Sequence, residues 1–186
     1  MVVTENNSTE YIKCRAELAS PDTNWVLSWS RIRLKGLGSE ASSFLWKLLH
    51  RILPTEERVA RILQNASANC RQCPTPTIAD LEHSFFHCVS TQEVGRCLLS
   101  SLRVYAPGVT PAGLLRLEFE EQGDKEMPVV WFAAQTLLYM WSVRKSGRIV
   151  DLRTTRAHLE SRINLLRETR YFNKQEIIRE IFDRML

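Results

Sequence analysis

Glycine and proline are scarce in this sequence, with seven of each among 186 residues. Folds made of many short strands depend on such residues in their tight turns, so the scarcity disfavours an all-β protein. The sequence also lacks a sustained alternation of apolar and polar residues, which is the mark of a half-buried strand. We therefore expect an all-α fold.

Long apolar runs are lacking as well. The first ten residues are polar, so the start of the sequence shows no secretory signal. The longest apolar segment, residues 129–143, contains Gln135, Thr136 and Ser142 and is shorter than the roughly 20 residues that span a bilayer. We interpret this segment as a buried core helix, and we expect an intracellular protein with no membrane partner.

The overall composition is that of an ordinary globular protein. Hydrophobic residues make up 44% of the chain and charged residues 25%, which disfavours wholesale disorder and a fibrous fold. The length suits one compact domain with tails. A formal net charge of +4 permits a nucleic-acid partner without requiring one.

Apolar residues recur at helical spacing along most of the chain. Leu45, Leu48, Leu49 and Ile52 share one helical face ahead of Pro54, which should end that helix. Further helices are expected over residues 77–88, with Thr77 as the cap, and over residues 91–105, 111–122, 128–148 and 152–170. A last helix is expected from the cap residue Asn173 to the C-terminus.

Three of the five cysteines cluster with histidines in the pattern C-x2-C-x9-H-x4-C. Cys70 and Cys73 can present two thiolates from one turn, and His83 with Cys88 can complete a tetrahedron, for which Zn²⁺ is the default ion. In an α-helix His83 and His87 would face the same way, so His87 competes with Cys88 as the fourth ligand. The alternative is a set of buried cysteines and a core histidine without metal.

A single zinc ion at this site is expected to be structural. A catalytic zinc keeps one position open for water and needs a nearby general acid or base. Here four ligands are available, and neither His83 nor His87 belongs to an H-x-E or H-E-x-x-H motif. The predicted organisation is a multi-helix domain with an inserted CCHC zinc knuckle. Its parts are a flexible tail over residues 1–20, N-terminal helices over 21–63, the knuckle over 64–90 and a C-terminal helical region over 91–186.

The order of motifs between residues 40 and 105 resembles the zinc-binding region downstream of the polymerase in LINE-type (non-LTR) retrotransposon reverse transcriptases. The resemblance is carried by Trp46, Leu53-Pro54-Thr55, Arg58-Val59-Ala60-Arg61, the Cys70 and Cys73 pair, and His83-Ser84-Phe85-Phe86-His87-Cys88. It favours Cys70, Cys73, His83 and Cys88 as the ligand set.

The resemblance implies that the chain handles template RNA or target DNA during target-primed reverse transcription. It implies nuclear residence and a polymerase region of the same polypeptide as a partner, with no small-molecule substrate. The chain is not itself expected to be an enzyme, because it lacks a carboxylate pair of the Tyr/Phe-Ala-Asp-Asp type, which two-metal nucleotidyl transfer would require.

Phosphate contacts require gathered Lys and Arg side chains. Residues 31–61 contain seven Lys and Arg against three Asp and Glu. A helix from Leu152 would place three arginines within an arc of roughly 60°. The candidate contacts are Lys47, Arg51, Arg58, Arg61, Arg71, Arg153, Arg156 and Arg167. Their alternative role is in ion pairs and helix-dipole interactions, such as a pair between Arg156 and Glu160.

A second class of function is compatible with the same features. The zinc could stabilise a protein–protein interaction scaffold, or a domesticated retroelement relic, that binds no nucleic acid. Salt-dependent binding of RNA or DNA would distinguish the two, because contacts to phosphates weaken steeply with added salt. A zinc hydrolase has the least support, since no general base accompanies the ligands.

Overall fold

A computed structural model describes residues 24–121, 125–166 and 174–185, and this part of the chain is all-α. The expected tail, residues 1–20, lies outside the described residues. The helices are α2 (Trp25–Arg31), α3 (Ser39–Leu49), α4 (Glu56–Ile62), a π-helix η1 (His83–His87), α5 (Gln92–Leu102), α6 (Pro111–Leu115), α7 (Glu126–Lys145), α8 (Leu152–Leu166) and α9 (Gln175–Asp183). Within the described ranges, the one β-type pairing is an isolated antiparallel bridge between Asn69 and Ile78.

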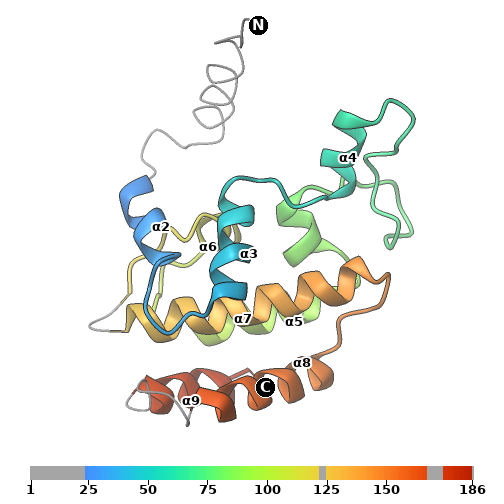
Figure 1. Ribbon diagram of the computed structural model, residues 1–186. Coiled ribbons are helices and arrows are strands. Elements are labelled where there is room, and N and C mark those ends of the chain that lie inside the picture. The colour runs from blue at the N-terminus through green and yellow to red at the C-terminus, as the bar shows by residue number, and fades with distance from the viewer. Residues whose placement is uncertain (1–23, 122–124, 167–173, 186) are drawn as a thin grey trace, which may run out of the picture.

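Helix α7 is the centre of the domain. It contacts α3 and η1 as well as α5, α8 and α9, and Figure 1 shows α8 and α9 on the side of α7 opposite to α3. Val129–Leu137 is buried without interruption because neighbouring helices cover the helix on several sides. The expected core helix is therefore confirmed. None of the described helices is both long and apolar enough to cross a membrane.

Two helices end earlier than their apolar spacing suggests. Helix α3 stops at Leu49, before Pro54, because Arg51 adopts a left-handed backbone with φ of 52°. The N–H of Ile52 then bonds to the carbonyl of Lys47 at 3.0 Å. Leu117, with φ of 54°, ends α6 in the same way, through a bond from Glu118 N–H to Gly113 O. Both ends are Schellman motifs without the usual glycine.

The helix expected over residues 77–88 is also different in the structure. Thr77 lies outside any helix and is not a helix cap. Residues 71–76, which precede it, form a loop. The helical part begins near Leu81, where Asp80 Oδ1 accepts a bond from the N–H of His83 at 2.7 Å. The segment then forms the π-helix η1, which begins at the candidate metal ligand His83 and has the candidate ligand Cys88 as its C-cap.

Gly95 lets α5 pack directly on η1. A Cβ at this position would lie 2.5 Å from the carbonyl oxygen of Phe85 and 3.0 Å from the ring of Phe86. We expect Gly95→Ala to reduce the free energy of unfolding by about 1–3 kcal/mol, because backbone must move to relieve the overlap. Gly108→Ala is the matched control, since nothing lies within 4 Å of its added Cβ. Urea unfolding of both variants measures the difference, and equal stabilities would contradict this account of the packing.

Candidate metal centre

Cys70 and Cys73 lie on a hairpin-like loop between α4 and η1. The N–H of Cys70 bonds to the carbonyl of Thr77 at 2.7 Å, and the N–H of Ala79 bonds to the carbonyl of Ala68 at 2.9 Å. These two bonds flank the bridge between Asn69 and Ile78 and close the loop. The tip of the loop therefore holds both cysteines of the C-x2-C pair together.

His83 and Cys88 come from the two ends of the π-helix. The N–H of Cys88 bonds to the carbonyl of His83 at 2.7 Å, a spacing of five residues that wider π-type turns permit. This wider turn brings residue 88, rather than residue 87, beneath His83. His87 instead points outward and contacts Glu82 at 3.2 Å. The competing ligand His87 thus lies outside the cluster because the local helix is not an α-helix.

The four side chains converge on one point. The ligand atoms of Cys70, Cys73, His83 and Cys88 all lie within 4.8 Å of one another. Cys88 Sγ lies 3.6 Å from Cys70 Sγ and 3.8 Å from Cys73 Sγ, and Cys73 Sγ lies 3.5 Å from His83 Nε2. A tetrahedral ion with metal–sulfur bonds of about 2.3 Å places neighbouring sulfurs about 3.8 Å apart. The cluster could therefore hold one metal ion.

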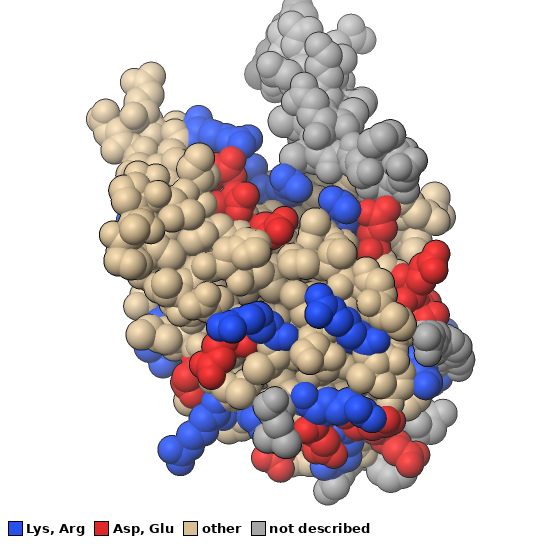
Figure 2. Space-filling view, turned by 180° about the vertical axis from the view of Figure 1, so that it is seen from behind, with Lys and Arg blue, Asp and Glu red and all other residues tan. Residues whose placement is uncertain are grey.

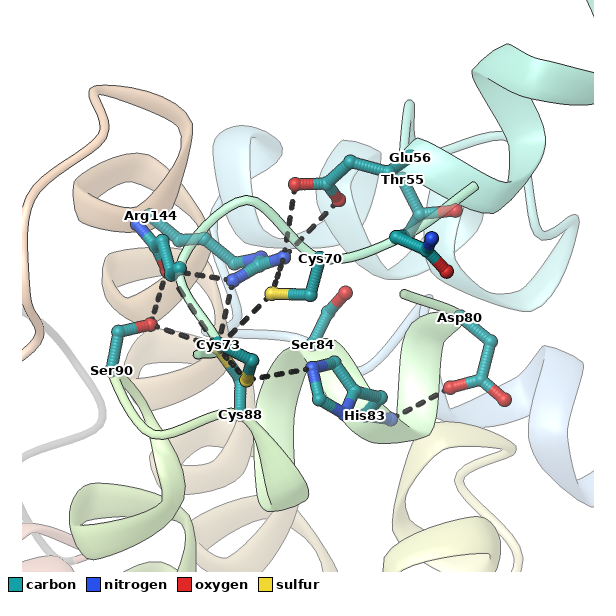
Figure 3. A network of polar contacts seen from close by, with 12 residues as sticks. Thr55, Glu56, Cys70, Cys73, Asp80, His83, Ser84, Cys88, Ser90 and Arg144 are labelled. Carbon is teal, nitrogen blue, oxygen red and sulfur yellow. Dashed lines mark hydrogen bonds and ion pairs between the residues drawn. The ribbon is translucent and has the colours of Figure 1, made fainter. Parts of the chain in front are cut away.

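Arg144 of α7 forms a second layer around these sulfurs (Figure 3). Its Nη1 donates to Cys88 Sγ at 3.2 Å and to Gln72 Oε1 at 2.8 Å. Its Nη2 lies 3.6 Å from Cys70 Sγ and donates to both carboxylate oxygens of Glu56 at 3.1 and 3.2 Å. The guanidinium side chain is only 5% exposed. Arg144 therefore links the cluster to α4 on one side and to the core helix on the other.

Two further polar side chains, Ser90 and Gln72, lie beside the sulfur of Cys88. Ser90 Oγ lies 3.2 Å from Cys88 Sγ and also donates to Gln72 Oε1. Gln72 thus receives hydrogen bonds from both Arg144 and Ser90. Such hydrogen bonds hold metal ligands in one orientation and reduce the negative charge on the sulfurs.

The surroundings favour a thiolate at Cys70. Burial opposes its ionisation, but hydrogen bonds from the Gln72 backbone, Arg144 and His83 outweigh burial and lower the pKa of Cys70 to about 6. Burial raises the pKa of Cys73, and the neighbouring cysteines add to the effect. The same cluster acts on the arginine: burial alone would lower the pKa of Arg144, but Cys70, Glu56 and Cys88 raise it above its ordinary value. The guanidinium stays charged beside the sulfurs.

Five of the expected phosphate contacts lie between residues 47 and 71, from α3 to the cysteine loop. Lys47 is exposed on α3, and Arg51 is exposed just beyond the end of that helix. Arg58 of α4 is half-buried and donates to the carbonyl of Arg51 at 2.9 Å, while Arg61 is 70% exposed and pairs with Glu57. Arg71 is exposed on the loop between Cys70 and Cys73. These five side chains thus lie on the segments that lead into the centre.

The other three candidates belong to the C-terminal region. Arg153 is exposed in the first turn of α8. Arg156 donates to the carbonyls of Phe182 and Met185, both at 3.2 Å, and its guanidinium lies 4.4 Å from the centre of the Phe182 ring. It therefore supports the end of α9 rather than pairing with Glu160. Arg167 lies outside the described residues.

Sequence reasoning missed four residues of the centre: Arg144, Glu56, Gln72 and Ser90. The contacts that join Arg144 to Gln72 and to Glu56 span 72 and 88 positions of the chain. No local motif signals such pairs. A lone arginine near the end of the most apolar helix, where burial of a charge requires a partner, was the one available signal.

Comparison with known proteins finds no family model, no curated protein and no solved structure that matches this chain.

Proposed function

We propose that this chain is a non-catalytic, zinc-stabilised domain that binds RNA or DNA. In the fuller form of this proposal, Cys70, Cys73, His83 and Cys88 form a CCHC zinc knuckle. The domain positions template RNA or target DNA for the polymerase region of a LINE-type reverse transcriptase and works in the nucleus. The role in a LINE-type reverse transcriptase and the nuclear location rest on the motif resemblance. Binding of nucleic acid by a zinc-stabilised domain rests on the site itself.

The donor set supports zinc as the metal. Three thiolates and one imidazole in tetrahedral arrangement suit Zn²⁺, while Mg²⁺ and Ca²⁺ prefer oxygen ligands. All four positions would be filled by protein side chains, three of them, Cys70, His83 and Cys88, from buried residues. A metal coordinated in this way stabilises the fold, since water has no open position from which to react.

One observation supports nucleic-acid binding. The side chains of four cations between α3 and the cysteine loop are exposed: Lys47, Arg51, Arg61 and Arg71. Cations held on metal-fixed segments can contact phosphates without first being ordered. Figure 2 shows that basic and acidic side chains are interspersed on the rear face of the molecule. Binding through a few local cations therefore suits this protein better than binding through one uniformly basic face.

Titration of labelled single-stranded RNA, single-stranded DNA and duplex DNA at several salt concentrations tests the proposal. We expect binding that weakens as salt rises. Lys47→Gln/Arg61→Gln should reduce the log–log salt slope by about 0.9 per lost contact with duplex DNA. Lys35→Gln/Arg103→Gln removes two exposed charges elsewhere and should bind as the unmodified chain does. Binding to none of the three probes would contradict the proposal.

The alternative is a zinc-stabilised protein–protein interaction scaffold or a domesticated relic. It is favoured by exposed apolar side chains on α4 and the cysteine loop: Ile62 is 68% exposed, Leu63 57% and Ile78 59%. Helix α4 has no buried residue, and Figure 1 shows it projecting from the helical body. Absence of salt-dependent binding in the titration above would support this alternative.

A further inference from the structure

A cleft opens beside the metal centre, between the cysteine loop, α4 and the C-terminal end of α7. Its volume is about 360 Å³, which falls within the usual range for sites that bind small ligands. The side chains that bear on its chemistry are Pro54, Val59, Arg71, Trp141, Arg144 and Lys145. They come from three segments that the centre and the core helix hold together.

Two cations of this cleft have no anionic partner among the described residues. Arg71 and Lys145 are both exposed, and neither side chain forms an ion pair or a hydrogen bond with another described residue. The carboxylate that lines the cleft, Glu56, is already engaged by Arg144 at 3.1 Å. The cleft therefore has two positive charges available for an incoming anion, such as a phosphate.

One wall of the cleft is aromatic. Trp141 of α7 is half-buried, and its ring packs 5.9 Å from that of Phe85, which is fully buried. Within the described residues the indole N–H makes no hydrogen bond, so a donor remains available beside the ring. Pro54 and Val59 add apolar surface. A fixed aromatic ring with nearby cations is the arrangement on which proteins stack unpaired bases.

We propose that this cleft binds one nucleotide of a single-stranded nucleic acid. The base packs against Trp141, and the phosphate lies between Arg71 and Lys145. The inference rests on the proposed function and names the substrate class within it. A paired base cannot enter, because it remains stacked inside its duplex, so the cleft selects single strands, ends and unpaired loops.

The test measures fluorescence anisotropy of a labelled U10 strand with the full chain loaded with zinc. Arg71→Gln/Lys145→Gln is expected to weaken binding about tenfold at low salt. The matched control, Lys35→Gln/Arg103→Gln, lowers the net charge equally and should change it little. Trp141→Leu should weaken binding by about fivefold or more. A blunt duplex of the same length should bind more weakly and be insensitive to Trp141→Leu.

Intrinsic fluorescence provides a readout that does not depend on the stability of Trp141→Leu. Binding of U10 should quench tryptophan emission. This quenching should be lost in Trp141→Phe and retained in Trp46→Phe, whose ring lies exposed on α3. Competition with uridine monophosphate shows whether the cleft binds a free nucleotide or a strand. If uridine monophosphate displaces U10 at equal concentration, the ligand is a free nucleotide. If it displaces U10 only weakly, the ligand is a strand.

The two proposals fail in different ways. If U10 binds with the expected salt dependence but the variants at Arg71, Lys145 and Trp141 bind as the unmodified chain does, the cleft is not the site and nucleic-acid binding survives. Equal binding of U10 and the duplex also overturns the cleft proposal. If neither probe binds, both proposals fall.

Discussion

Replacement of Cys88 by serine is expected to abolish stoichiometric metal binding. Cys88 is fully buried, and its sulfur lies within 4 Å of the sulfurs of both Cys70 and Cys73. A serine hydroxyl is a poor substitute for a thiolate ligand of zinc. Since structural zinc contributes on the order of 10 kcal/mol in small metal-dependent domains, loss of the ion should also lower the unfolding temperature substantially.

Two variants control for this result. His87→Ala should retain one ion per chain, because His87 points away from the cluster toward Glu82. Cys97→Ser removes a thiol from α5, outside the cluster, and should also retain the ion. Elemental analysis of the purified variants gives metal per chain, and a thermal melt with and without chelator gives the stability. A full equivalent of metal in Cys88→Ser, or its loss in His87→Ala, would contradict the ligand set.

The sequence predicts part of this centre and not the rest. Spacing alone indicates that Cys70, Cys73 and His83 converge, because only a few residues separate the two cysteines from each other and from the histidine. It does not decide between His87 and Cys88, because α-helical geometry favours a spacing of four residues. The π-type bond from Cys88 N–H to His83 O changes that spacing to five. The close packing of η1 against Gly95 of α5 joins two consecutive elements, and local periodicity does not encode it.

The fold, like the metal centre, is only partly predictable from the sequence. The all-α class and the core helix follow from the apolar pattern of the sequence, and the longest apolar segment lies within α7, where most of its residues are buried. The ends of α3 and α6 do not follow from it. Each depends on a non-glycine residue, Arg51 or Leu117, in a left-handed conformation that local propensity disfavours. Such ends are set by the backbone bonds that close the turn and by burial of the flanking segment.

The second large effect is expected at Arg144. Three thiolates and one Zn²⁺ carry a net charge of −1, and Arg144 places one positive charge against two of the sulfurs. Arg144→Met should therefore weaken zinc affinity about 10–100-fold, as loss of residues that hold metal ligands commonly does. It also leaves Glu56, 20% exposed, without its cation. Removal of one partner of a largely buried pair should reduce the free energy of unfolding by about 3 kcal/mol.

A double variant separates the loss of zinc affinity from the loss of stability. Arg144→Met/Glu56→Leu removes the unpaired carboxylate, so its stability should be higher than the sum of the single effects predicts. Its zinc affinity should stay low, because the sulfurs of Cys70 and Cys88 still lack the guanidinium donor. Competition with a zinc-binding dye measures the affinity, and urea unfolding of the zinc-loaded proteins measures the stability. If zinc affinity in Arg144→Met equals that of the unmodified chain, Arg144 serves only to join α4 to α7 and has no influence on the metal centre.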